Sequence, residues 1–143
     1  MKIIIGADHA GYSLKQEIIE LLQEKEIPYR DVGTNVEESV DYPDFAGEVA
    51  RSVAENDDHR GILICGTGIG MSIAANKVKG IRAALCHDTV SARATRNHND
   101  ANVLTMGARI IGPDLAREIV RVWLEEDFDG GRHQRRINKI SDL

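Results

Sequence analysis

The sequence predicts an α/β fold, a three-layer α/β/α sandwich around a five-stranded parallel sheet. Short, β-branched apolar runs alternate along the chain with stretches whose apolar residues recur at helical spacing. Strands that alternate with helices form an open parallel sheet with both faces covered. The chain has 143 residues, 42% of them apolar, and no repeat or linker. We therefore expect one domain over residues 1–143.

The expected strands are short and mostly apolar, and they lie at residues 2–6, 29–32, 62–64, 82–86 and 102–106. The run 62–64 is apolar throughout, which is typical of a strand buried on both faces of a sheet. It is followed at once by glycines, so the central strand should end in a tight loop.

The helices between these strands have recognisable starts. Ser13 and Gln16 are spaced as a capping box. Pro43 and Pro113 suit the first position of a helix, and Asp88 suits a cap. The apolar stripes expected to face the core are Leu14, Ile18, Leu21 and Leu22; Ala46, Val49, Ala50 and Val53; and Leu115, Ile119, Val122 and Trp123.

The stretch from Gly61 to Asn76 predicts a strand, a glycine-rich loop and a helix in direct succession. Glycines allow a backbone to approach a ligand closely, and the free N–H groups at a helix start face negative charge. Cys65 at the end of the strand and Thr67 in the loop add a thiol and a hydroxyl. A helix start also favours the thiolate form of a nearby cysteine. The stretch therefore indicates chemistry as well as anion binding.

Polar side chains follow most of the expected strands. Because ligands of parallel sheets bind beyond the carboxyl ends of the strands, these side chains should share one edge. They are Asp8 and His9 after the first strand, Cys65 and Thr67 after the third, His87 and Asp88 after the fourth, and Arg109 after the fifth.

The C-terminal segment 130–143 begins with Gly130-Gly131 and is basic in an otherwise acidic chain. If it is helical, Arg132 and Arg136 lie on one face, where two guanidiniums can bind one phosphate. Spacing alone is equally compatible with a solvated basic terminus.

Composition excludes several classes of function. A net charge of −5 argues against a nucleic-acid partner. The chain has two cysteines, with no C-x-x-C motif and no cluster of metal ligands, and it therefore suits a reducing compartment without a structural metal. Asp8 comes too early for a signal peptide, and no apolar run has membrane-spanning length. We expect a cytoplasmic protein that needs neither metal nor cofactor.

Five segments in order carry a family resemblance: Asp8-His9, Asp41-Tyr42-Pro43, Cys65 to Gly70, His98-Asn99-Asp100 and Gly130 to His133. Together they resemble ribose-5-phosphate isomerase type B, of the ribose/galactose isomerase family, over nearly the whole chain. The resemblance implies a Rossmann-like sandwich with strand order 2-1-3-5-4 and a homodimer or dimer of dimers with shared active sites. It also implies cofactor-free interconversion of ribose 5-phosphate and ribulose 5-phosphate, a reaction of the pentose phosphate pathway.

The same resemblance implies roles for individual residues. Cys65 matches the base that moves a proton between C1 and C2, and His98 matches the residue of ring opening. A related branch uses a glutamate farther along the loop, where this chain has Met71. In relatives His98, Asn99 and Arg109 come from the neighbouring subunit. The remaining matches are Thr67 and Asp8 for catalysis; the amides of Gly66, Gly68, Ile69 and Gly70 for the enediolate oxygen; Asn99 and Tyr42 for the sugar; His9, Arg132 and Arg136 for the phosphate; and Arg109 for a further anion contact.

Alternatives remain at this point. A nucleotide-binding module is one, but Met71 stands where G-x-G-x-x-G requires its third glycine. Relatives that isomerise allose 6-phosphate or galactose 6-phosphate leave the length of the sugar open. Cys86 and Trp123 are expected in the core, and His59, among acidic residues, is expected to be solvated.

Overall fold

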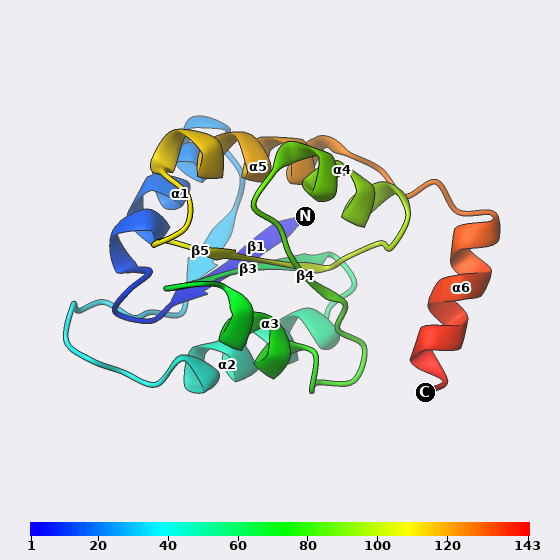
Figure 1. Ribbon diagram of the computed structural model, residues 1–143, viewed down its shortest axis with the longest axis horizontal. Helices are drawn as coiled ribbons and strands as arrows, with labels where there is room; N and C mark the ends of the chain where they lie inside the picture. Colours follow the sequence, from blue (N-terminus) through cyan, green and yellow to red (C-terminus); the bar gives the residue numbers. More distant parts are fainter.

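The computed structural model describes residues 1–143, and every expected strand and helix is present in it (Figure 1). In chain order the elements are β1 (Lys2–Ala7), α1 (Tyr12–Glu24), β2 (Tyr29–Asp31), α2 (Tyr42–Ala54), β3 (His59–Cys65), α3 (Ile69–Ala75), β4 (Ala83–Leu85), α4 (Thr89–Asn97), β5 (Val103–Gly107), α5 (Pro113–Glu125) and α6 (Arg132–Ser141).

All five strands are parallel, in the order β2-β1-β3-β5-β4, which confirms the expected fold and strand order. The register aligns the ends of the three central strands. Ala7 lies opposite Ile64, and Cys65 lies opposite Gly107. The segments that follow β1, β3 and β5 therefore begin side by side at one edge of the sheet.

Helices α1, α4 and α5 cover one face of the sheet, and α2 and α3 cover the other (Figure 1). Side chains alternate between the faces of a strand, and β1 shows this directly. Ile3 and Ile5 belong to the apolar core beneath α1 and α5, whereas Ile4 belongs to the core beneath α2 and α3. Trp123 is fully buried in the first core, as expected. No helix is long and apolar enough to span a membrane.

Most of the helix starts follow the local sequence, with one correction. Pro43 and Pro113 lie in the first turn of their helices. Asp88 caps α4 by accepting from the Ser91 N–H at 2.6 Å and the Ser91 hydroxyl at 3.0 Å, and these bonds lower the pKa of its carboxyl. The capping box expected at Ser13 was wrong. The N-cap of α1 is Gly11, two residues earlier, and the Gly11 N–H bonds to the Asp8 carboxylate.

Three smaller expectations also need correction. Leu115 is exposed on α5 and Val122 is only partly buried, because Ala116 and Val120 take the inner face of that helix. His59 is not solvated. Its ring is largely covered and lies 3.3 Å from the Ser52 hydroxyl, so β3 begins inside the packed part of the molecule.

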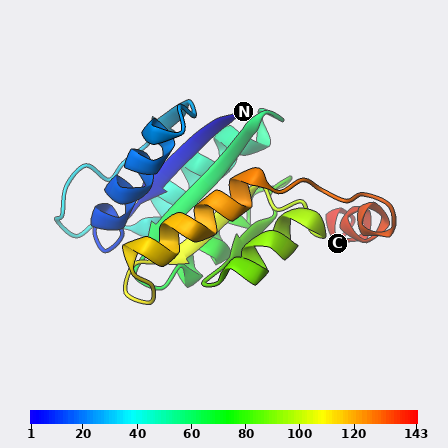
Figure 2. The same ribbon diagram turned by 90° about the horizontal axis from the view of Figure 1, so that it is seen from above.

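Helix α6 stands outside the sandwich. In Figures 1 and 2 it lies at one end of the molecule, beyond α4, while the connection from β1 to α1 lies toward the opposite end. Ile137 is its one buried residue, and its charged side chains are exposed. The segment 130–143 is therefore helical, which is the condition for Arg132 and Arg136 to share a face, but it contributes little to the core.

Candidate active site

The loop after β3 turns the Cys65 thiol toward backbone amides. Gly68 adopts a left-handed conformation with φ of 78°, which only glycine adopts without strain. This turn brings the Gly68 N–H to 3.1 Å from Cys65 Sγ and the Ile69 N–H to 3.3 Å from Thr67 Oγ1. Thr105 secures the turn from beneath, since its hydroxyl donates to the Gly68 carbonyl at 3.1 Å. The Cys65 sulfur therefore lies against the first amides of the loop, just before α3 begins.

The end of β5 supports this loop from one side. The Ala108 N–H donates to the Cys65 carbonyl at 2.9 Å, and the Arg109 N–H donates to the Gly66 carbonyl at 3.0 Å. Gly107 allows the close approach. A Cβ there would lie 2.6 Å from the carbonyl carbon of Thr67 and 2.7 Å from its Cα. The absence of a side chain at position 107 therefore allows the loop to pack directly against the end of β5.

Replacing Gly107 by alanine tests this support. We expect the new methyl group to push the loop away from β5, lowering stability by about 1–3 kcal/mol. Turnover should fall roughly 100-fold, because a shift of about 1 Å misplaces the reacting groups. Urea unfolding and a kinetic assay measure the two effects. Gly112→Ala is the matched control, since a Cβ there meets nothing within 4 Å. A Gly107→Ala enzyme as active as this control would contradict the assigned role.

Two side chains cover the loop. A Cβ at Gly70 would lie 2.4 Å from the Tyr42 ring, so this tyrosine packs directly on the start of α3. A Cβ at Gly66 would lie 3.0 Å from an Arg109 guanidinium nitrogen. The resemblance to known relatives assigns Arg109 to a neighbouring subunit. In this structure it lies against the loop of its own chain, because β5 ends directly beside β3.

Asp8 and His9 occupy the same edge. Asp8 is nearly buried, and its carboxylate accepts from the Gly11 N–H at 3.1 Å. His9 Nδ1 accepts from the Val40 N–H at 3.2 Å. This bond leaves the ring proton on Nε2, where it can donate to a ligand. The two residues thus add a carboxylate and a hydrogen-bond donor to the thiol loop.

The structure places the other expected site residues in a second group, apart from the thiol loop. His98 follows the last residue of α4, and its ring stacks on the His133 ring with centroids 4.5 Å apart and planes inclined by 16°. Arg132 and Arg136 are exposed on the same helix as His133, and Asn99 follows His98. Both views show α6 at the end of the molecule away from the β1–α1 connection (Figures 1 and 2). One chain therefore carries two separate halves of the expected site.

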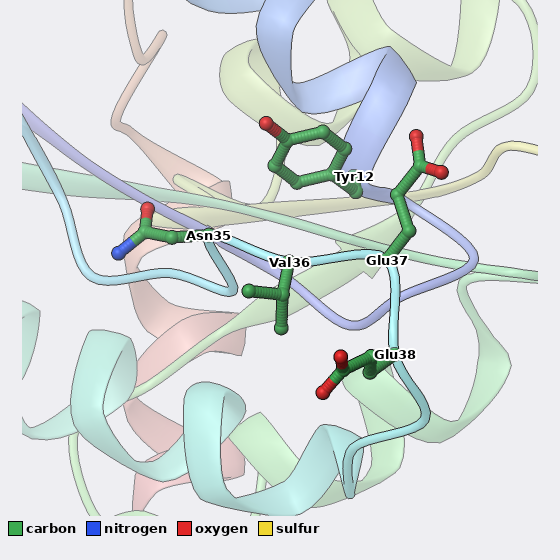
Figure 3. A pocket seen from close by; sticks show the side chains of 5 residues that line it. All are labelled: Tyr12, Asn35, Val36, Glu37 and Glu38. Carbon is green, nitrogen blue, oxygen red and sulfur yellow. The ribbon is translucent and has the colours of Figure 1, made fainter.

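A hollow of about 530 Å³ lies beside the first half, between Tyr12 and the loop of residues 35–38 (Figure 3). Glu37 and Glu38 make it acidic, so it is unsuited to a phosphate group. The loop does have a structural role. It positions Val40, whose N–H donates to His9 Nδ1.

Sequence reasoning missed two residues that shape the site. Lys15 is fully buried and binds the Asp31 carboxylate at 2.7 Å and the Thr34 carbonyl at 2.6 Å, which fixes the loop after β2. Its position beside Leu14, on the apolar stripe of α1, was the available signal. His133 pairs with His98 across two distant segments, and no local pattern predicts that contact.

A thiol on an amide-lined loop, with a hydroxyl, a carboxylate and an imidazole nearby, is equipped for proton transfer to and from a substrate that develops negative charge. The fold and this edge of the sheet define an acid–base enzyme of the parallel α/β class.

Comparisons with known proteins identify the family. The ribose/galactose isomerase model matches residues 3–140. A putative sugar phosphate isomerase of Bacillus subtilis is 61% identical, over 99% of this chain and 96% of that protein. D-erythrulose-4-phosphate isomerase of Pectobacterium atrosepticum is 48% identical, over 98% and 93%. The solved structure of Clostridium thermocellum ribose-5-phosphate isomerase B has a TM-score of 0.95 at 55% identity, covering 99% of this chain and 96% of that one. The chain belongs to the ribose/galactose isomerase family, and it is a sugar-phosphate isomerase of the aldose–ketose type.

Proposed function

We propose that this enzyme interconverts ribose 5-phosphate and ribulose 5-phosphate through an enediolate, with Cys65 as the base. The observation that carries the proposal is the contact between Cys65 Sγ and the Gly68 N–H, at the mouth of an amide-lined loop. A base must lie where the developing oxyanion also finds donors, and this loop supplies both.

The proton moves between neighbouring carbons of the open-chain sugar. The Cys65 thiolate takes the proton from C2 of the aldose, and the electron pair forms the C1–C2 double bond of the enediolate. The thiol then returns the proton to C1, while the oxygen on C2 becomes the ketone. Backbone amides of residues 66–70 stabilise the intermediate negative charge, and the Thr67 hydroxyl assists proton exchange between the oxygens. No step in this route requires a metal or a cofactor.

Ring opening is assigned to His98, with Asp8 at the same end of the sugar. His98 and Cys65 belong to separate halves within one chain. A second subunit of the same protein therefore supplies His98 and Asn99 to the thiol loop. A two-fold homodimer, alone or within a dimer of dimers, then contains two identical composite sites.

The phosphate is assigned to hydrogen-bond donors from both halves, a neutral imidazole and three guanidiniums. His9 Nε2 and Arg109 lie beside the thiol loop, and Arg132 and Arg136 lie one turn apart on the exposed face of α6. Two guanidiniums at this spacing can make charge-assisted bonds to one phosphate. In a dimer, α6 of one copy would close over the substrate held by the other.

Relatives with four-carbon and five-carbon substrates make sugar length the point to test. We expect kcat/KM for ribose 5-phosphate to exceed that for allose 6-phosphate, galactose 6-phosphate and erythrulose 4-phosphate, by roughly tenfold or more. Steady-state assays with equal enzyme and each sugar measure this order. A higher value for a six-carbon or four-carbon sugar would reject ribose 5-phosphate as the preferred substrate and leave the acid–base assignment in place.

A further inference from the structure

We propose that His98, Asp129 and His133 form an inhibitory binding site for a divalent transition-metal cation of the zinc class. His98 directly follows α4, His133 is the second residue of α6, and Asp129 lies in the connection between α5 and α6. The inhibitory part rests on the proposed function, since the cation would occupy the imidazole assigned to ring opening. The binding itself does not.

The geometry suits a cation of this kind. One ligand atom from each of the three side chains lies within 4.8 Å of the other two. Zinc bonds of about 2.0–2.1 Å to nitrogen and oxygen require ligand atoms roughly 3.3 Å apart. His98 and Asp129 are exposed and His133 is half-buried, so small rotations of these side chains can close the difference without disturbing the core. Two imidazoles and a carboxylate are a ligand set that zinc accepts.

The backbone holds Asp129 near the two histidines. Its N–H donates to the Asn97 carbonyl at 3.0 Å, in the residue before His98. The Asn97 side chain donates to the Asp127 carbonyl at 2.8 Å and to Glu126 at 3.0 Å. The end of α4 and the start of the connection to α6 are thus fastened together, and the cost of assembling the three ligands is reduced.

The charges around the cluster are mixed. Arg132 precedes His133 and Arg136 lies one turn further along α6, whereas Asp129 carries the opposite charge. The same arginines repel a bound cation, while the Asp129 carboxylate attracts it. We therefore expect reversible binding, weaker than that of a closed structural zinc site.

Calorimetry with Zn²⁺ tests the binding. The Cys65→Ser chain, freed of metal with EDTA and dialysed, serves as the background, so that the thiol is not a competing ligand. We expect one Zn²⁺ per chain, and affinity weakened roughly tenfold or more by Asp129→Asn or His133→Gln in the same background. His59→Gln is the control, because His59 lies at the start of β3 and should have no effect. Unchanged affinity in both cluster variants would overturn the site.

Turnover with a cysteine-containing enzyme tests the inhibition. We expect Zn²⁺ to inhibit the wild type, EDTA to restore it, and Asp129→Asn to keep its basal turnover while requiring roughly tenfold more Zn²⁺ for the same inhibition. Equal inhibition of the Asp129→Asn enzyme would assign the effect to Cys65 and overturn the inhibitory role. Zinc binding by a chain without turnover on any of the four sugars would instead refute the proposed function and support the metal site.

Discussion

Replacing Cys65 by alanine should abolish isomerisation while the protein still folds and binds substrate. A general base commonly contributes about 10²- to 10⁴-fold to a rate, and no other thiol, carboxylate or imidazole contacts the Gly68 amide. We expect kcat to fall by roughly 1,000-fold or more and the calorimetric affinity for ribose 5-phosphate to change little. The loss of the sulfur acceptor should cost about 1 kcal/mol of stability, which leaves the fold intact.

Two further variants separate chemistry from structure in this experiment. Cys65→Ser keeps an acceptor for the Gly68 N–H but replaces the thiol with a much weaker acid, so it should be nearly as inactive as the alanine variant. Cys86→Ala is the matched control. Cys86 is fully buried in the core, and desolvation raises the pKa of its thiol to about 11, so it should remain protonated and inert. Near-normal turnover of either Cys65 variant would remove the thiol from the mechanism.

The sequence was sufficient to predict the sheet and the thiol loop because their signals are local. Apolar runs such as 62–64 predict strands. Few backbone conformations connect a buried strand to a helix through a glycine loop, so the loop could be predicted as well. The cap at Asp88 follows the same logic, since a carboxylate three residues before a free N–H satisfies it. The shared edge of Asp8, Cys65 and Arg109 then follows from parallel strand topology.

The position of α6 could not be predicted in this way. Its sequence allows a helix, and the spacing of Arg132 and Arg136 places them on one face of that helix. The position of a weakly packed terminal helix, however, depends on contacts between segments that are distant in the sequence. The stacking of His133 on His98 is one such contact. The predicted start of α1 was wrong for a related reason. The turn after β1, in which the Gly11 N–H bonds to the Asp8 carboxylate, places the N-cap at Gly11 instead of Ser13.

In the proposed enzyme, each active site combines the thiol loop of one chain with His98 of another. Mixing two inactive variants, Cys65→Ala and His98→Ala, tests this shared site. Equal amounts are unfolded together and refolded, so that chains pair at random, and differently sized tags confirm the mixed dimers. In a shared arrangement each mixed dimer has one site with both lesions and one site with none.

Half of the dimers should be mixed, and activity should therefore return to about a quarter of the wild-type value. Each variant refolded alone provides the baseline, and co-refolded wild type gives the recovery of the procedure. If Cys65 and His98 of the same chain serve one site, every site keeps a lesion. Confirmed mixed dimers with no recovered activity would contradict the shared site.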